Sequence, residues 1–151
     1  MVMDLRKAMF RAWFRISRPM TLGVRAIVEN DAGKVLLVRH TYVRGLFLPG
    51  GGVERGEPAQ DALTRELVEE AGVELVDAPE LLGIYSNHRV FRNDHVLLYR
   101  IRDWRAVEAT SRGEIAEIIW TDPLALPSDV TPGTKRRLAA VFGGGDASLY
   151  W

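Results

Sequence analysis

The stretch from Gly51 to Glu57 reads GGVERGE, and after seven further residues the stretch from Arg65 to Val73 reads RELVEEAGV. Within the second stretch, Glu66, Glu69 and Glu70 are spaced i, i+3 and i+4, which places their carboxylates on one face of a helix. Like charges at this spacing destabilise an isolated helix by roughly 0.2–0.5 kcal/mol per pair. A sequence that accepts such local costs usually holds a functional site there.

The surroundings of the three glutamates favour a cation site over a solvated helix face, which is the alternative for any cluster of acids. Gly72 predicts the end of the helix, so the carboxylates crowd the negative end of its dipole, at about 0.3–1 kcal/mol each. The segment Pro49–Gly52 lets the backbone turn tightly and approach a ligand, and Pro58 suits a first helical position. The sequence has no cysteine, so carboxylate ligands indicate Mg²⁺ or Mn²⁺ rather than zinc.

Residues 51–73 follow the pattern G-x5-E-x7-R-E-L-x-E-E-x-G-V and match its nine specified positions. The pattern resembles the Nudix (MutT-like) box. Similarity to that family extends to Val35–Arg39 as the strand before the site, to Gly45–Gly52 as the lead-in and to Gly113–Trp120 as a late strand. The resemblance covers about residues 20–142 and implies a Nudix-like α/β/α sandwich with a mixed β-sheet.

The resemblance implies a metal-dependent pyrophosphohydrolase that cleaves a nucleoside diphosphate linked to another moiety X, by attack of water at a phosphorus of the pyrophosphate. The residues that match catalytic positions of the family are Glu57, Arg65, Glu66, Glu69 and Glu70. Those that match oxygen donors to the metal are Gly50 (through its carbonyl group), Glu66, Glu69, Glu70 and Glu114. Arg65 and Glu57 match a structural pair whose arginine orients the acids. Glu117 is the alternative to Glu114 for the additional carboxylate on the late loop. The general base is not assigned among Glu66, Glu69 and Glu114.

The residue types suit this chemistry independently of the resemblance to the family. Metal ions neutralise a pyrophosphate, align the attacking water and stabilise the leaving oxygen, and phosphoryl transfer depends mainly on positioning and electrostatics. An arginine fork can hold two phosphate oxygens, and the polar break around His88 is a plausible substrate loop. The resulting substrate-binding candidates are Arg39, Arg44, Arg55, His88 and Arg89. Solvated surface positions are the alternative for each arginine, and an ordinary exposed turn is the alternative for His88.

The identity of the substrate is not fixed by the sequence. Subfamilies for ADP-ribose or dinucleoside polyphosphates carry a proline or tyrosine beyond the box, and the stretch His88–Phe91 has neither. The coenzyme A signature is not apparent, and an oxidised nucleoside triphosphate stays open. A second class of function is a non-catalytic Nudix module that binds a nucleotide ligand as a sensor or regulator. The intact acid cluster with Arg65 favours the enzyme.

Composition indicates a small enzyme. The chain has 151 residues, enough for one domain with a hydrophobic core. Lys+Arg and Asp+Glu each number 20, so no global charge draws the chain to nucleic acid, and we expect no stable nucleic-acid partner. The absence of cysteine favours the cytoplasm, and no apolar run approaches the length of a membrane span. A homodimer, common in the family, is compatible with the sequence.

The ends of the chain differ from the domain that we expect at residues 20–142. Residues 1–19 form a basic amphipathic arm or helix, in which Asp4 is the only acid. Such a segment predicts weak contact of residues 4–16 with an anionic membrane surface; the alternative is a helix packed on the domain or on a second subunit. Residues 143–151 read as a tail whose Leu149–Trp151 end is able to dock.

Hydrophobic patterns along the domain predict alternating strands and helices of an α/β fold. The predicted strands are 22–28, 35–38, 81–85, 96–101 and 115–120, and the predicted helices are 58–71 and 132–142. The first two strands are joined by the turn Asn30–Gly33, which predicts a hairpin-like connection. In helix 58–71, Leu63, Leu67 and Ala71 form an apolar stripe beside the acids, so one side packs on the core and the other faces a cleft. The pattern predicts a mixed sheet covered by helices on both faces.

Overall fold

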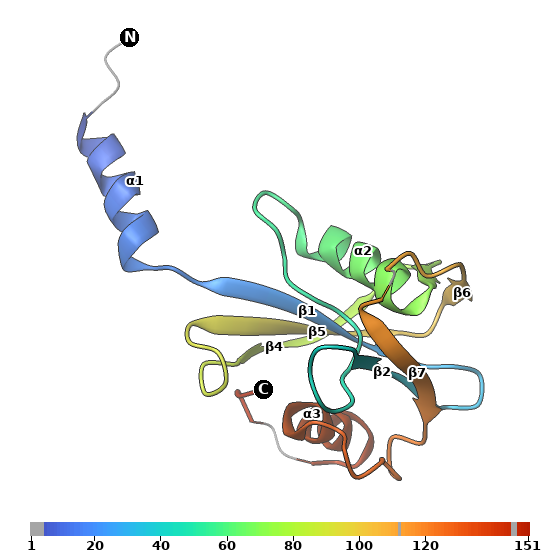
Figure 1. Ribbon diagram of the computed structural model, residues 1–151. Helices are drawn as coiled ribbons and strands as arrows, with labels where there is room; N and C mark the ends of the chain where they lie inside the picture. The colour runs from blue at the N-terminus through green and yellow to red at the C-terminus, as the bar shows by residue number, and fades with distance from the viewer. Residues whose placement is uncertain (1–4, 112, 146–147) are drawn as a thin grey trace.

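The computed structural model describes residues 5–111, 113–145 and 148–151 of the chain (Figure 1). Its helices are α1 (Leu5–Ser17), α2 (Ala59–Ala71) and α3 (Pro132–Phe142). Its strands are β1 (Thr21–Val28), β2 (Val35–His40), β3 (Val73–Leu75), β4 (Glu80–Ser86), β5 (Asp94–Ile101), β6 (Trp104–Ala106) and β7 (Ile115–Thr121). The predicted strands and helices are confirmed within one or two residues, except that the short strands β3 and β6 were not expected.

The strands form three hydrogen-bonded groups in the order β1-β5-β4, β2-β7 and β3-β6. β1 runs parallel to β5, whereas β4 is antiparallel to β5 and β7 is antiparallel to β2. The strand layer is therefore mixed, as predicted. It lies between α2 on one side and α3 on the other (Figure 1). The α/β/α order of layers is confirmed.

Two hydrophobic clusters hold the three layers together. On one side of the strands, Val24 and Ala26 of β1 pack in the same cluster as Leu63 and Leu67 of α2. On the other side, Ile27 of β1 packs in a cluster with Leu138 of α3. Because successive strand residues point to opposite faces, β1 joins both clusters and fixes the strand layer against α2. The side of α2 that carries the acids is thereby set next to the ends of β1 and β2.

The connection between β1 and β2 is a correction to the predicted hairpin. The turn itself forms, since the backbone N–H of Gly33 donates to the carbonyl of Asn30 at 2.9 Å. Beyond a single bridge between Glu29 and Val35, however, β1 pairs with β5 and β2 pairs with β7. Every residue of β2 except Arg39 is buried, as are Val24 and the last three residues of β1, which is typical of strands covered on both faces. The two strands consequently separate into different groups of the central layer.

The predicted bounds of the site helix are nearly correct. Pro58 is the N-cap residue and the helix begins at Ala59, one residue later than expected. Gly72 ends the helix in the left-handed conformation, with φ of 61°. A Cβ atom at this position would lie 2.4 Å from the carbonyl oxygen of Val107. Gly72 therefore provides both the backbone conformation and the space that the end of α2 requires.

We expect Gly72→Ala to lower the free energy of unfolding by about 2 kcal/mol, through the left-handed φ and the clash with Val107. Gly33 is the matched control, because it has a similar φ of 72° and no atom lies within 4 Å of the place that a Cβ would occupy. Gly33→Ala should lower the free energy of unfolding by about 1 kcal/mol. Urea denaturation of both variants measures the difference, and equal losses would show that the contact with Val107 has no effect.

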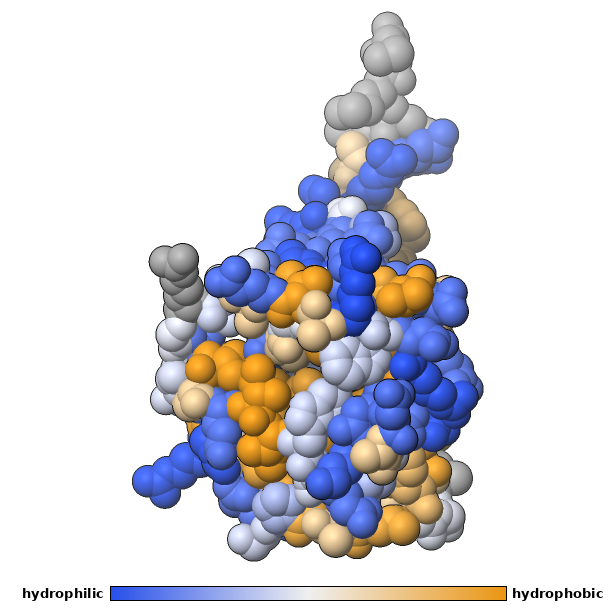
Figure 2. Space-filling view, turned by 90° about the vertical axis from the view of Figure 1, so that its right-hand side faces the viewer, coloured by the Kyte–Doolittle hydropathy of each residue, from blue (hydrophilic) through white to orange (hydrophobic). Residues whose placement is uncertain are grey.

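The helix α1 projects from the body of the molecule in Figures 1 and 2. Its large apolar side chains are exposed, among them Phe10, Trp13 and Ile16, at 61, 58 and 80%. This arrangement does not agree with the alternative of a helix packed on its own domain. Residues 1–4 of the expected arm, including Asp4, lie outside the described residues. In the described part of the chain, no helix has the length and apolarity that crossing a membrane requires.

The end of the chain packs on the domain, in agreement with the expectation that Leu149–Trp151 are able to dock. Trp151 packs at the margin of the cluster around Leu138, and Tyr150 forms a bridge with Ser86 at the end of β4. α3 ends at Phe142, as predicted. Residues 146 and 147 of the tail lie outside the described residues.

Candidate active site

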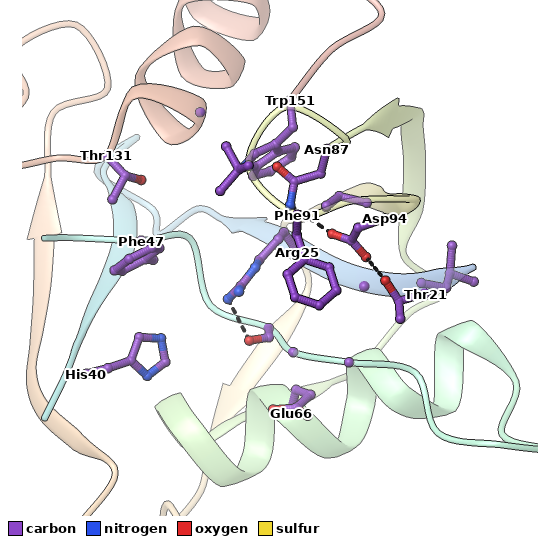
Figure 3. A pocket seen from close by; sticks show the side chains of 18 of the residues that line it. Thr21, Arg25, His40, Phe47, Glu66, Asn87, Phe91, Asp94, Thr131 and Trp151 are labelled. Carbon is purple, nitrogen blue, oxygen red and sulfur yellow. Dashed lines mark hydrogen bonds between the residues drawn. The ribbon is translucent and has the colours of Figure 1, made fainter. Parts of the chain in front are cut away.

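A cavity of about 710 Å³ opens between α2, the start of β1 and the start of α3. This volume falls in the range of small-molecule sites. Glu66, Glu70 and Glu114 line it together with Arg25 and His40. Figure 3 shows Glu66 and α2 on one side of the cavity and Trp151 and Asn87 on the other, with the side chain of Arg25 between them. The predicted cleft beside α2 is therefore present.

The glycine-rich segment before α2 approaches β1 at Gly50 and the carboxylate of Glu66 at Gly51. Gly50 has φ of 139°, and a Cβ atom there would lie 2.0 Å from the carbonyl oxygen of Val24 in β1. A Cβ atom at Gly51 would lie 2.4 Å from the carboxylate of Glu66. Only glycine fits at Gly50, where the clash is with backbone, whereas a Cβ atom at Gly51 would require the carboxylate of Glu66 to move. The loop is thus held between β1 and α2, and its backbone forms part of the cavity wall beside the acids.

Glu70 is the most buried of the three clustered glutamates, with 6% of its surface exposed. Its Oε2 accepts a hydrogen bond of 3.0 Å from the backbone N–H of Gly50. Burial raises the pKa of Glu70 to about 7, and Glu66 and Glu114 add to this, whereas the Gly50 bond and Arg25 oppose it. A buried carboxylate of this kind is stabilised by a cation, and such groups cluster at functional sites.

Arg65 holds the other side of the acid cluster. Its Nε and Nη2 donate to the two carboxylate oxygens of Glu57 at 2.9 and 3.1 Å, a bidentate geometry. Its Nη1 donates to Glu66 at 2.8 Å and to Glu69 at 3.4 Å, and Nη2 donates to the Gly52 carbonyl at 3.2 Å. The hydrogen bonds with Glu57 raise the pKa of Arg65 above its usual value, Glu66 raises it further, and burial opposes the shift. One guanidinium thus contacts three carboxylates and one carbonyl of the preceding loop.

Sequence reasoning did not identify Arg25, which lies at the centre of the cavity. Its Nη1 donates to the carbonyl oxygens of Gly50 at 2.6 Å and of Leu48 at 3.1 Å. Burial lowers the pKa of Arg25, and the charges of Glu70 and Glu66 oppose that shift. The Gly50 carbonyl, expected to face a metal, accepts from Arg25 in this structure. One signal was available: Arg25 is the single charged residue in the otherwise apolar strand β1.

His40, at the end of β2, was also missed, because the histidines show no ligand spacing in the sequence. It is buried, and its Nδ1 lies 3.7 Å from Oε1 of Glu70 without a hydrogen-bond partner in the described structure. Burial lowers the pKa of His40, and the charge of Arg25 lowers it further. Of the two late carboxylates, Glu114 lines the cavity, whereas Glu117 is paired with Arg39 at 2.9 Å.

The structure places the remaining candidates outside the cavity lining. Glu69 has a side chain 40% exposed and contacts Arg65. Arg39 forms ion pairs with Glu117 and Asp129, and the guanidinium of Arg89 lies 3.9 Å from the ring centre of Tyr150. The Nδ1 of His88 accepts from the backbone of Asn93 at 3.0 Å, while Arg44 and Arg55 are exposed. Among the described residues, no three acidic or histidine side chains come together closely enough to form a metal site.

Comparison with known proteins agrees with the fold. A family model described as the NUDIX domain matches residues 19–141. The chain belongs to the Nudix family. It is therefore a Nudix hydrolase, an enzyme of the class that acts on phosphoanhydride bonds.

Individual Nudix relatives carry different substrates in their names. The chain is 46% identical over 128 residues to the nucleoside triphosphatase NudI of Escherichia fergusonii, covering 75% of this chain and 90% of that protein. It is 36% identical over 97 residues to an ADP-ribose pyrophosphatase of Methanocaldococcus jannaschii, covering 62% of this chain and 53% of that protein. A MutT NUDIX hydrolase structure from Burkholderia pseudomallei shares the fold, with a TM-score of 0.70 and 23% identity over 82% of this chain and 98% of that one.

Proposed function

We propose that this Nudix hydrolase cleaves a nucleoside diphosphate linked to another moiety X, with water attacking a phosphorus of the pyrophosphate and Mg²⁺ or Mn²⁺ bound at the acids. The observation that carries the proposal is the buried carboxylate of Glu70 beside Glu66 in a cavity of nucleotide size. Burial of a carboxylate with a raised pKa lowers the stability of the fold unless a bound ligand stabilises the charged form.

The donor atoms around the cavity suit a hard cation. Glu66, Glu70 and Glu114 supply carboxylate oxygens to one cavity, and Gly50 presents a backbone carbonyl beside them. Mg²⁺ typically takes one or two protein carboxylates and completes its shell with waters and substrate phosphates. We assign Gly50, Glu66, Glu69, Glu70 and Glu114 as the residues that would hold the ion. The ion would neutralise the pyrophosphate and orient the attacking water.

The other residues of the site act on geometry and charge. Arg65 and Glu57 form a bidentate pair next to Glu66, which supports a role in fixing the acid's orientation. Arg25 brings a positive charge into the cavity beside Glu70, where it favours anionic substrate groups. Since Arg39 and Arg89 are engaged elsewhere, we place Arg25 ahead of the sequence-based candidates for contact with the pyrophosphate.

Assays of purified protein distinguish the enzyme from a non-catalytic nucleotide sensor. The panel contains nucleoside triphosphates, nucleotide sugars, dinucleotides and coenzyme A with Mg²⁺ or Mn²⁺, and release of phosphate, pyrophosphate or nucleoside monophosphate is measured. We expect at least one compound to be hydrolysed, with activity lost in a chelator and restored by metal. Tight binding of a nucleotide with no turnover in any metal would identify the sensor instead.

We further propose that α1 contacts an anionic lipid surface. Arg11 and Arg15 lie on one side of the helix, four residues apart, and Trp13 lies on the other side with Ile16. The first turn of α1 has no acidic residue, so the helix has the charge that complements anionic headgroups. A helix of 13 residues gains little stability by itself in water, which favours a partner for its apolar face.

Co-sedimentation with vesicles tests this contact. The intact protein should bind phosphatidylglycerol vesicles and not phosphatidylcholine vesicles, and Arg11→Glu should weaken binding about 10-fold or more. Arg92→Glu, an equal charge reversal at an exposed position outside α1, is the matched control. Loss of a dimer in Trp13→Ala, without vesicle binding by the parent protein, would instead identify a second copy of the chain as the partner of α1.

A further inference from the structure

Trp151 lines the cavity on the side away from the acids of α2 (Figure 3). The segment Ser148–Trp151, which ends with this residue, runs beside the end of β4 and is joined to it by a single bridge between Tyr150 and Ser86. The backbone N–H of Ser86 donates to the carbonyl of Leu149 at 2.9 Å, and that of Trp151 donates to the carbonyl of Ser86 at 3.0 Å. These bonds set the direction in which the indole of Trp151 leaves the backbone.

Two consecutive arginines of α3 hold this segment in place. Arg137 is 1% exposed, and its Nη1 donates to the Ser148 carbonyl at 3.3 Å. Its guanidinium also lies 4.2 Å from the ring centre of Tyr85. Arg136 donates to the carbonyl oxygen of Trp151. The segment is therefore anchored at both ends, and little conformational entropy remains to be lost when a ligand contacts it.

Gly133 makes room for the indole at the start of α3. A Cβ atom at Gly133 would lie 2.4 Å from Nε1 of Trp151 and 2.5 Å from its Cδ1. The indole also contacts Tyr85 in an edge-on arrangement, with ring centres 6.2 Å apart. The position of Trp151 is thus defined by tight packing.

Polar groups stand next to this aromatic wall. The side-chain amide of Asn87 donates to Oδ2 of Asp94 at 2.8 Å, and Thr21 donates to Oδ1 of the same carboxylate at 2.7 Å. Asp94 thereby fixes the orientation of Asn87, whose amide carbonyl accepts no hydrogen bond from the described residues. Phe91, exposed at 58%, lines the same part of the cavity. Flat aromatic surface beside an oriented amide suits an aromatic heterocycle with hydrogen-bonding edges.

We propose that Trp151 and Phe91 form a subsite for a nucleobase, with Asn87 facing its edge. The inference rests on the proposed function, since it gives the nucleoside of the substrate a place in the cavity that holds the pyrophosphate near Glu66. Stacking on an aromatic side chain changes affinity for a base by about 5- to 150-fold. Trp151 is accordingly a residue that selects substrates with a base over phosphate compounds without one.

Binding of reaction-product analogues tests the subsite without requiring turnover. Dissociation constants are measured for AMP, GMP, CMP and UMP, and for ribose 5-phosphate, which has the same sugar phosphate and no base. At least one nucleotide should bind about 5- to 150-fold more tightly than ribose 5-phosphate. Trp151→Ala and Gly133→Ala should remove this difference, because the alanine methyl group of Gly133→Ala displaces the indole. Trp151→Phe should retain most of it.

Leu149→Ala is the matched control, since its side chain is in the same segment and 77% exposed; it should bind like the parent protein. The proposal is overturned if no nucleotide binds better than ribose 5-phosphate, or if Trp151→Ala weakens both ligands equally. Hydrolysis without a base preference would leave the enzyme assignment intact and reject the subsite. A base preference without hydrolysis of any compound would support the subsite and reject the enzyme assignment.

Discussion

Replacing Glu70 by glutamine should lower kcat/KM at least about 100-fold, beyond the loss typical of groups that only support a metal ligand. The amide oxygen of glutamine can still accept the hydrogen bond from Gly50, which Glu70 accepts at 3.0 Å, so the local structure is retained. What is lost is the negative charge that attracts a divalent cation. The measurement is steady-state kinetics with verified metal content, together with calorimetric titration of Mg²⁺ and Mn²⁺.

Glu108→Gln is the matched control, because Glu108 is exposed and outside the cavity; it should leave kcat/KM unchanged. Full activity of Glu70→Gln, or equal heats of metal binding in Glu70→Gln and the parent protein, would remove Glu70 from the ligand set.

Glu69→Gln tests whether the carboxylate of Glu69 reaches the metal. Glu69 contacts Arg65 outside the cavity lining, and a loss comparable to that of Glu70→Gln would show that its carboxylate turns towards the metal on binding.

The same Glu70→Gln variant should be more stable than the parent protein when metal is removed. Burial raises the pKa of Glu70 from 4.5 to about 7, so the folded state binds a proton more tightly than the unfolded state. Above pH 7 the buried carboxylate is charged, and the difference in pKa corresponds to about 3 kcal/mol lost from the free energy of unfolding. Glutamine has no charge to bury and should recover that amount.

The pH dependence of this effect has a defined sign. Stability of the parent protein, relative to Glu70→Gln, should fall as pH rises from 4.5 to 7, because the folded state holds the extra proton in that window. Below pH 4.5 the two proteins should differ little. Urea denaturation in a chelator across this range gives the comparison, with Glu108→Gln as control. A Glu70→Gln protein less stable than the parent at pH 8 would contradict the origin assigned to the pKa shift.

Together these results would describe a site whose function lowers the stability of the fold. Metal should reverse the effect, since a ligand that binds only the folded state adds to its stability. Mg²⁺ should therefore raise the melting temperature of the parent protein and have little effect on Glu70→Gln. This opposition between activity and stability is common at functional sites.

The sequence by itself determined the local structure around the site. The spacing of Glu66, Glu69 and Glu70 predicted a helix, and the glycine at position 72 predicted its end, which lies there. Helix and strand periods depend on neighbours a few residues away, so they can be read from a single chain. The pair of Arg65 and Glu57, whose atoms meet at 2.9 Å, was implied by the resemblance of the box to the family.

Tertiary structure alone decided which charges share the cavity. Arg25 meets the Gly50 carbonyl, and His40 meets Glu70, across 25 and 30 positions of sequence. Arg39 was a candidate for substrate contact by sequence, yet Asp129, 90 residues away, holds it outside the cavity. Burial and charge coupling arise where distant segments pack, and the hydrophobic pattern of a strand does not specify its partner. For that reason β1 paired with β5 instead of β2, and the partners of each buried charge followed from that pairing.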